Sequence, residues 1–349
     1  MSAPDPALGL SGHRIALVLG GGNALGAYHG GVYQALDEAG IEPDWVVGTS
    51  IGSVNGAIIA GNPRERRLER LRDLWRPAGE PGGWPVPWDM LPEEWRRTSA
   101  AITTLLAGHT GFFGPIGSFA TGWSGDAAGG SPALYDTQML NDTLAALVDF
   151  ELLNRARPRF SAMTVDIETG EEVVFDTSRQ PLSPNHIRAS AALLTAYPAV
   201  EIDGRLLGDG GLSANLALDP IMSAEDPSPV LCIAADLLPL SSKRPNSFGE
   251  VISQMQNLTF AAQSRRSLER WQATFDARAS AGADLPSITL VKLAYSDQEQ
   301  EVAGKAMDFS PESVRQRWAA GLADGSRLVE RLKSGEIALG RPGLSVETG

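Results

Sequence analysis

A serine lies between two glycines in the sequence Gly-Thr-Ser-Ile-Gly, which spans residues 48–52 and directly follows the apolar run 45–47. This arrangement is typical of a nucleophile elbow, a sharp strand-to-helix turn that projects the serine hydroxyl at the N-terminus of the helix. Gly48 and Gly52 leave the space that such a turn needs. The pattern therefore predicts that Ser50 is the nucleophile of an acyl hydrolase.

A second glycine-rich turn lies nearer the N-terminus, where the apolar run 15–19 leads into the sequence Gly-Gly-Gly-Asn-Ala-Leu-Gly at residues 20–26. Its backbone N–H groups lie at the start of a predicted helix, a place where negative charge is favoured. When two such turns lie side by side, one supplies a nucleophile and the other an oxyanion hole. Together they indicate a serine acyl hydrolase.

The serine needs a base, and the usual base, histidine, occurs only at His13, His29, His109 and His186. In an α/β-hydrolase the histidine follows both the serine and the acidic residue, so the absence of a histidine after His186 disfavours that triad. Asp209 is the alternative base, because it lies in a tight Gly-Asp-Gly-Gly sequence directly after an apolar strand. A partly dry site would raise its pKa toward the working pH. The competing interpretation is an Asx turn, in which the carboxylate bonds its own backbone.

The elements that must hold these residues alternate between strands and helices in the N-terminal part. We expect a strand at 14–19, a helix at 24–39, a strand at 44–47 and a helix that ends near residue 60. Such alternation predicts a parallel sheet in an α/β layer structure. Further strands are expected at 159–165, 172–176, 199–203, 230–235 and 287–293, and further helices at 137–148, from 184, at 249–275 and at 310–333.

The predicted catalytic domain spans residues 13–236, with a loose tail at 1–12 before it. Residues 77–135 are rich in proline, glycine and aromatic residues, and we interpret them as an insertion that forms a lid over an acyl-chain pocket. The alternatives are a surface insertion packed by its own aromatic residues and a contact between two copies of the chain. An α-rich extension at 237–339 is expected to pack on the same domain, and 340–349 to be a second loose tail.

Composition narrows the class of protein. A formal net charge of −13 over 349 residues argues against nucleic-acid binding and against attraction of the whole surface to anionic membranes. The single cysteine, Cys232, favours a reducing compartment, and no apolar run resembles a signal sequence or reaches transmembrane length. We therefore expect a cytoplasmic protein that is at most peripheral at the membrane.

One segment, 64–76, is rich in charge, with six arginines and three acidic residues. We interpret it as a surface helix that packs Leu68, Leu71 and Trp75 inward and pairs its arginines with acids. The alternative is a basic amphipathic helix that lies on phospholipid.

Three motifs resemble those of the patatin-like phospholipase family: the glycine turn at 21–27, the serine turn at 48–52 and the Asp-Gly-Gly sequence at 209–211. The resemblance covers residues 14–236 and implies a three-layer α/β/α fold with a mostly parallel central sheet. It also implies hydrolysis of lipid acyl esters by a Ser–Asp dyad without histidine, metal or other cofactor. By position it assigns the nucleophile to Ser50, the proton acceptor to Asp209, and the oxyanion hole to the amides of Gly21, Gly22 and Asn23. The residues that support these motifs are Gly20, Gly26, Gly48, Gly52, Gly210 and Gly211.

The glycine turn departs from the usual family sequence at two positions. Asn23 stands where glycine is usual, and asparagine is among the few other residues that tolerate a positive φ. Leu25 stands where many members have arginine. The missing charge favours an uncharged or zwitterionic lipid ester as the substrate.

Other functions remain alternatives to a lipid hydrolase. The same chemistry would serve an intracellular esterase or a polyester depolymerase, and the fold alone would serve a catalytically silent lipid-binding protein. A dinucleotide-binding unit is disfavoured, because glycines at 20, 22 and 26 do not match the Gly-x-Gly-x-x-Gly spacing. The expected partners are a lipid or small ester substrate and a membrane surface in transient contact, with a homodimer left open and no nucleic acid.

Overall fold

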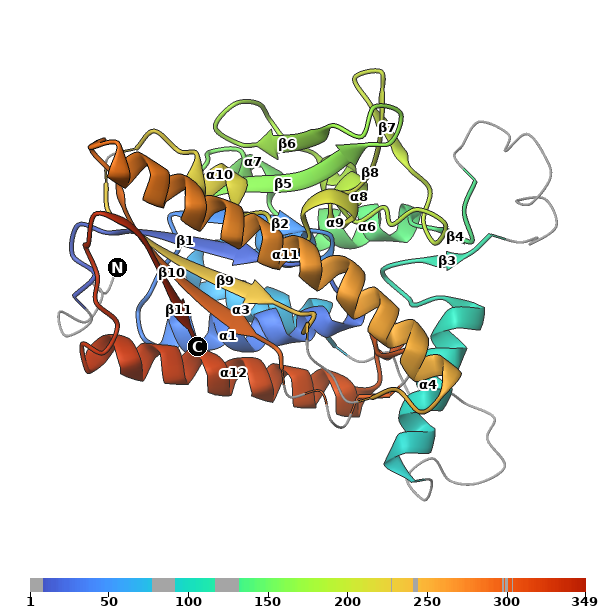
Figure 1. The fold of residues 1–349 in the computed structure, drawn as a ribbon. Helices are drawn as coiled ribbons and strands as arrows, with labels where there is room; N and C mark the ends of the chain where they lie inside the picture. The colour runs from blue at the N-terminus through green and yellow to red at the C-terminus, as the bar shows by residue number, and fades with distance from the viewer. Residues whose placement is uncertain are drawn as a thin grey trace.

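The computed structural model describes residues 9–76, 92–116, 132–226, 228–240, 244–296, 298, 301–302 and 304–349. The strands of its central sheet are β1 (Arg14–Leu19), β2 (Trp45–Thr49), β5 (Arg159–Asp166), β6 (Glu172–Asp176), β7 (Val200–Ile202), β8 (Arg205–Asp209), β9 (Val230–Asp236), β10 (Ser287–Ala294) and β11 (Gly343–Thr348). Their order is β11-β10-β9-β1-β2-β5-β8-β7, with β6 also paired to β5 (Figure 1). Pairing is parallel from β11 to β5 and antiparallel at β6, β7 and β8. The sheet is therefore mostly parallel.

Helices cover both faces of this sheet, which gives the predicted three-layer α/β/α fold. The described helices are η2 (Asn23–Gly26), α1 (Ala27–Glu38), α2 (Ile51–Ala60), α3 (Arg64–Leu74), α4 (Glu93–Ala107), α6 (Gln138–Leu147), α7 (Phe150–Leu153), α8 (Pro184–Ser190), α9 (Gly211–Ala214), α10 (Asp219–Met222), α11 (Phe248–Ser280), η4 (Lys305–Met307) and α12 (Pro311–Lys333). Along β1, Leu17 and Leu19 join the core that contains α1 and α2, whereas Ala16 and Val18 join the core under α11. Both faces of the strand are apolar because both are buried.

The two predicted tails are partly wrong. Residues of the segment 340–349 form β11, which pairs with β10 from Gly343 to Thr348, and Val346 packs against the core. The strand is short and its alternating pattern is weak, so only the pairing with β10 makes it ordered. At the other end, Leu10 lies within the predicted tail 1–12 but is buried in the core.

The region 237–339 contributes more than packed helices, because it also supplies β10 to the sheet. Its last helix, α12, lies along α1 (Figure 1). Glycines make this contact unusually close: a Cβ on Gly31 would lie 1.9 Å from the carbonyl oxygen of Trp318, and one on Gly321 would lie 2.0 Å from that of Tyr28. The backbones of two helices that lie far apart in the sequence are thus in direct contact.

The predicted insertion 77–135 lies partly outside the described residues, namely at 77–91 and 117–131. Its described parts form α4 and the short antiparallel pair of β3 (Gly114–Pro115) with β4 (Tyr135–Asp136). Whether the whole insertion is a lid therefore remains a prediction.

The arginine-rich helix α3 packs as expected. Leu71 and Trp75 are buried and Leu68 is half-buried. Most of the arginines of 64–76 pair with acidic side chains, as in the bonds from Arg64 to Asp37 at 3.0 Å and Glu42 at 2.7 Å, whereas Arg72 bonds the side chain of Gln34. Among the described residues, no helix is both long and apolar enough to cross a membrane.

Candidate active site

Ser50 lies between β2 and α2 in a strained backbone conformation, with φ 56° and ψ −126°. Two glycines make this turn sterically feasible. A Cβ on Gly48 would lie 2.4 Å from the Cα of Ser53, and one on Gly52 would lie 2.1 Å from the carbonyl oxygen of Leu19. The turn therefore has the geometry of a nucleophile elbow.

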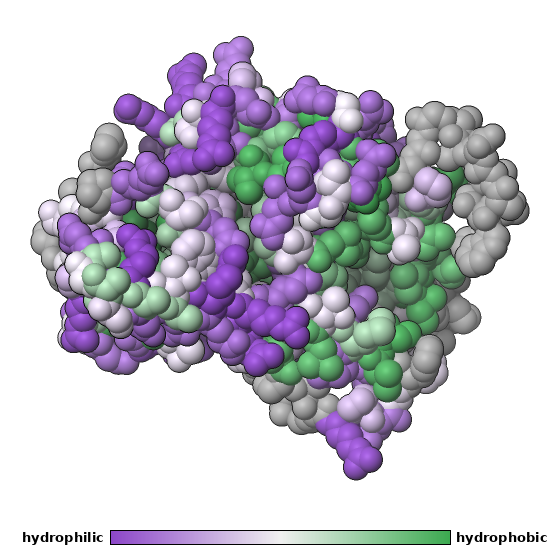
Figure 2. Space-filling model, turned by 45° about the horizontal axis from the view of Figure 1, so that its top comes forward, coloured by the Kyte–Doolittle hydropathy of each residue, from purple (hydrophilic) through white to green (hydrophobic). Residues whose placement is uncertain are grey.

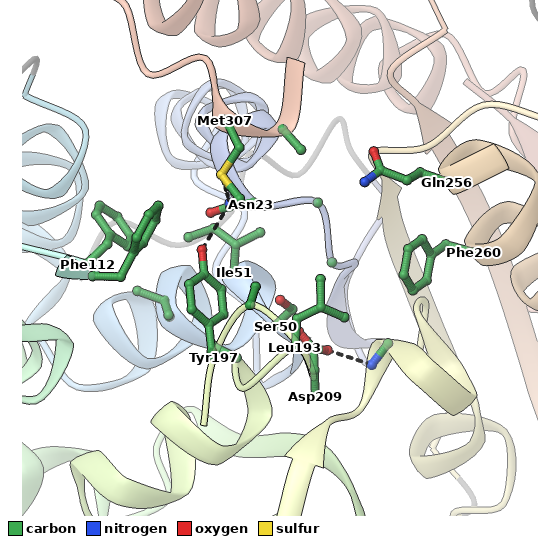
Figure 3. A pocket seen from close by; sticks show the side chains of 18 of the residues that line it. Asn23, Ser50, Ile51, Phe112, Leu193, Tyr197, Asp209, Gln256, Phe260 and Met307 are labelled. Atoms are coloured by element: carbon green, nitrogen blue, oxygen red, sulfur yellow. Dashed lines mark hydrogen bonds between the residues drawn. The ribbon is translucent and has the colours of Figure 1, made fainter. Parts of the chain in front are cut away.

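Strand register brings Asp209 beside this turn. β5 lies between β2 and β8, with Thr49 opposite Met163 in the parallel pair and Thr164 opposite Asp209 in the antiparallel pair. Ser50, which follows Thr49, thus meets Asp209 across one strand, and Figure 3 shows the two residues as neighbours. The Ser50 hydroxyl lies close enough to the Asp209 carboxylate to lower its pKa. The structure therefore brings together the two residues that the sequence singled out.

Asp209 is almost fully buried, and burial raises the pKa of its carboxyl to about 6 because the charged form loses solvation. Two polar groups favour the ionised form and limit this rise: the nearby Ser50 hydroxyl, and the Gly211 amide, which donates a hydrogen bond to Oδ1 at 2.7 Å. The Gly211 bond is the Asx-type contact considered above as an alternative, and it coexists with the contact to Ser50. The carboxylate is thus placed to accept a proton near neutral pH.

The glycine turn faces the same cavity, but only some of its amides are free. Gly21 donates its N–H to the carbonyl oxygen of Asn215 at 3.1 Å, so the expectation that Gly21 supplies an oxyanion donor is wrong. No described residue accepts a hydrogen bond from the amides of Gly22, Asn23 or Ile51, all three of which line the cavity. Asn23 has φ 51°, which confirms the positive φ expected there.

Two further residues, Ser190 and Asn215, shape the site, and the sequence assigned neither of them a role. The hydroxyl of Ser190 accepts the N–H of Ser50 at 3.1 Å and donates to the carbonyl oxygen of Met163 at 2.6 Å, which fixes the elbow. The side-chain amide of Asn215 donates to the carbonyl oxygen of Gly21 at 3.3 Å. These contacts join residues 140 and 194 positions apart, and no local pattern reveals such pairs.

The remaining motif glycines lie where the backbone is crowded. A Cβ on any of them would meet another atom at 2.5–3.2 Å, and they are Gly20, Gly26, Gly210 and Gly211. Their lack of a side chain therefore lets the three turns pack against one another.

The histidines are not connected to the site. Hydrogen bonds among the described residues link none of the four to Ser50 or Asp209. His29 is fully buried, and burial lowers its pKa to about 3, so it is neutral and packs beside Asn55. Within the described ranges, no group of three or more His, Cys, Asp or Glu side chains is placed to hold a metal ion.

A cavity of about 390 Å³ opens beside Ser50 (Figure 3). Its described lining is mainly apolar and includes Val54, Leu105, Phe112, Phe113, Leu140, Leu193, Tyr197, Leu238, Ile252, Phe260 and Met307. Leu105, Phe112 and Phe113 belong to the predicted insertion, whose described part is therefore a wall of the cavity. Asp209 is the one charged residue of the described lining.

The raised pKa of Asp209 predicts an acid limb in the pH profile of hydrolysis. Because the carboxylate must be ionised to accept the serine proton, kcat/KM should fall about tenfold per pH unit below a midpoint of about 6 and level off above it. Steady-state assays of a soluble ester across this range measure the midpoint. A midpoint at the ordinary carboxyl value of 3.8 would contradict the effect of burial.

The chain is similar to several known proteins. A family model described as patatin-like phospholipase matches residues 17–222, and a second, described as patatin phospholipase, matches residues 259–336. A patatin-like phospholipase domain-containing protein of Caenorhabditis elegans is 29% identical over 212 residues, which cover 60% of this chain and 13% of that protein. An uncharacterized NTE family protein of Mycobacterium tuberculosis is 26% identical over 255 residues, 72% of this chain and 58% of that protein.

The lysophospholipase NTE1 of Candida glabrata is 27% identical over 252 residues, which cover 70% of this chain and 12% of that protein. The chain thus spans between 12% and 58% of the length of these three relatives.

Proposed function

Because this chain belongs to the patatin-like phospholipase family, we propose that it is a serine hydrolase that cleaves lipid acyl esters through Ser50 and Asp209. One observation carries this proposal. The buried carboxylate of Asp209 lies beside the strained Ser50 at the wall of an apolar cavity. A nucleophile, a base and a place for an acyl chain are thus combined in one site.

The proposed reaction begins when Asp209 takes the proton of the Ser50 hydroxyl and the serine oxygen attacks the ester carbonyl carbon. Negative charge then develops on the carbonyl oxygen, where the amides of Gly22, Asn23 and Ile51 donate hydrogen bonds. Collapse of this intermediate breaks the bond to the alcohol, which leaves with the proton from Asp209. Water, deprotonated by Asp209, releases the fatty acid and restores Ser50.

The proposed substrate is a neutral or zwitterionic lipid ester with one acyl chain in the cavity. A volume of about 390 Å³ is near the lower end of ligand sites, so it fits one chain better than two. The described lining offers no cation to bind a phosphate. A lysophospholipid, the substrate class in the name of the Candida glabrata relative, meets these conditions.

A substrate panel on the purified protein tests this proposal. It contains lysophosphatidylcholine, phosphatidylcholine, a triacylglycerol, a short-chain nitrophenyl ester and a soluble polyester, with a fluorophosphonate to label the active serine. We expect labelling of Ser50 and preferred hydrolysis of the single-chain lipid. Hydrolysis of the polyester alone would favour a depolymerase, and neither labelling nor hydrolysis would favour a silent lipid-binding protein.

We further propose a cytoplasmic protein whose cavity mouth contacts a zwitterionic lipid surface. Exposed apolar side chains surround this mouth on α4 and α11, and Figure 2 shows apolar residues gathered on this face. They are Ile102, Leu105, Leu106, Val251, Ile252, Met255 and Leu258, which we call the apolar rim. Leu105 and Ile252 also line the cavity, and residues 98–107 and 251–264 contain no ionisable side chain. The rim is therefore suited to lipid without anionic headgroups.

Leu106 and Met255, which are 76% and 61% exposed and do not line the cavity, test this contact. The double variant Leu106→Ser/Met255→Ser should bind phosphatidylcholine vesicles at least about tenfold more weakly, since each loses apolar burial worth about 1–2 kcal/mol. Its hydrolysis of the short-chain ester should be unchanged. Co-sedimentation measures the binding, with salt varied.

Replacement of Arg66, Arg70 and Arg72 on α3 by glutamine is the matched control, and it should leave this binding unchanged. Strong, salt-sensitive binding to phosphatidylglycerol that this triple variant abolishes would instead assign the contact to α3. A change from dimer to monomer in the rim variant, seen by light scattering, would instead identify the rim as a contact between two copies.

A further inference from the structure

Arg317 of α12 is fully buried, and each of its five N–H groups has an acceptor. Nε and Nη2 donate to the Glu301 carboxylate at 2.8 and 2.7 Å. The other three bonds go to backbone carbonyl oxygens, those of Ala24 at 3.1 Å, Asp308 at 2.7 Å and Lys305 at 3.0 Å. One guanidinium therefore joins two separate segments of backbone, one at Ala24 and the other at 305–308.

Both segments border the active-site cavity. Ala24 follows Asn23 in η2, the turn whose free amides face the cavity. Lys305 and Asp308 lie on either side of Met307, which lines the cavity beside this turn, and the Asn23 side-chain amide lies 3.4 Å from the sulfur of Met307 (Figure 3). Arg317 thus ties the turn to the adjacent cavity wall without itself lining the cavity.

The surroundings of Arg317 hold its guanidinium in one orientation. Arg97 of α4 pairs with Glu301 at 2.7 Å and with Asp308 at 3.1 Å, and both of these acidic side chains are buried. A buried charge that lost its partners would be costly, so the cluster has little freedom to rearrange. Lysine could not replace arginine here, because a single ammonium offers three donors from one point rather than five in a planar fork.

We propose that Arg317 is a positioning residue for the oxyanion hole, which it aligns by holding the Ala24 carbonyl against the segment 305–308. This inference rests on the proposed hydrolase function. Oxyanion donors act only when they are fixed where charge develops, and small displacements in such sites cost large factors in rate. The region after residue 237 thereby helps to set the geometry of a site whose proposed catalytic and oxyanion-hole residues all lie before position 210.

The test compares Arg317→Lys with wild type on a soluble short-chain ester, with active sites titrated by a fluorophosphonate. We expect kcat per titrated site to fall about 10- to 100-fold while KM changes by less than about threefold, since the oxyanion forms only after binding. Titration separates slower catalysis from a loss of folded protein. Glu301→Gln keeps the shape of the partner of Arg317 and should give a smaller fall in kcat per titrated site, again with little change in KM. If Arg317→Lys does not fold, the kcat of Glu301→Gln tests the proposal in its place.

Arg96→Met is the matched control, because the Arg96–Glu312 pair at 2.9 Å also joins α4 to α12 but does not touch the turn. It should lower the melting temperature while leaving kcat per site unchanged. Unchanged kcat in Arg317→Lys, or equal losses in Arg317→Lys and Arg96→Met, would overturn the proposal. Failure of the proposed hydrolase function would be distinct, because wild type itself would then hydrolyse no ester.

Discussion

Ser50→Ala should lower ester hydrolysis by about a thousandfold or more, the scale seen when the nucleophile of a serine hydrolase is removed. The fold should persist, because the elbow is fixed by backbone contacts: the Ser50 carbonyl accepts from the Ser53 N–H at 2.9 Å, and its own N–H bonds Ser190. Steady-state kcat and fluorophosphonate labelling measure the loss, and circular dichroism checks the fold.

The surface variant Ser223→Ala is a suitable control, since Ser223 bonds only the carbonyl oxygen of Asp219 and lies outside the cavity. It should retain full activity. A Ser50→Ala variant that keeps activity within about tenfold of wild type would exclude Ser50 as the nucleophile.

Asp209→Asn should be nearly as damaging, because an amide cannot accept the serine proton but still bonds the Gly211 N–H. The double variant with Ser50→Ala should be little worse than either single change, since two residues that act as a unit are not additive. Asp203→Asn is the matched control, at an exposed turn where φ of 52° suits asparagine as well as aspartate. A histidine variant that is folded but inactive would instead restore a triad.

The same Asp209→Asn change should stabilise the fold at neutral pH. The pKa of Asp209 is about 6 in the folded protein and ordinarily 3.8, so the folded protein binds this proton more tightly than the unfolded chain does. The contribution of Asp209 to the free energy of unfolding is therefore most favourable below pH 3.8 and declines as the pH rises to 6. Above pH 6, removal of the charge should raise the free energy of unfolding by up to about 3 kcal/mol. Urea unfolding of both proteins at acidic and neutral pH measures the difference.

The sequence predicted the parts of the site that local patterns encode. Ser50 and the glycine turn each lie within one strand-to-helix junction, so the residues that shape them are near neighbours in the chain. Local sequence alone does not predict the role of Asp209, because its position beside Ser50 depends on the register of β2 and β8 with β5. The fold class followed from the alternation of strands and helices.

The incorrect or missing predictions all depend on contacts between distant residues. The Gly21 amide is taken by a carbonyl oxygen 194 positions away, and Arg317 reaches the carbonyl oxygen of Ala24 over 293 positions. β11 is ordered by pairing with β10, which its own short sequence does not reveal. Neither spacing nor propensity carries such information.

The close contact between α1 and α12 has a consequence for synthesis of the protein. The glycine-lined face of α1 leaves the ribosome early, but its partner on α12 follows roughly 15 to 60 seconds later at ordinary translation rates. β1 must likewise wait for β9, its parallel neighbour from Arg14 to Leu19. While β9 and α12 are still to be made, the nascent chain therefore carries a central strand that is paired only with β2 on one edge, and a helix face that is uncovered.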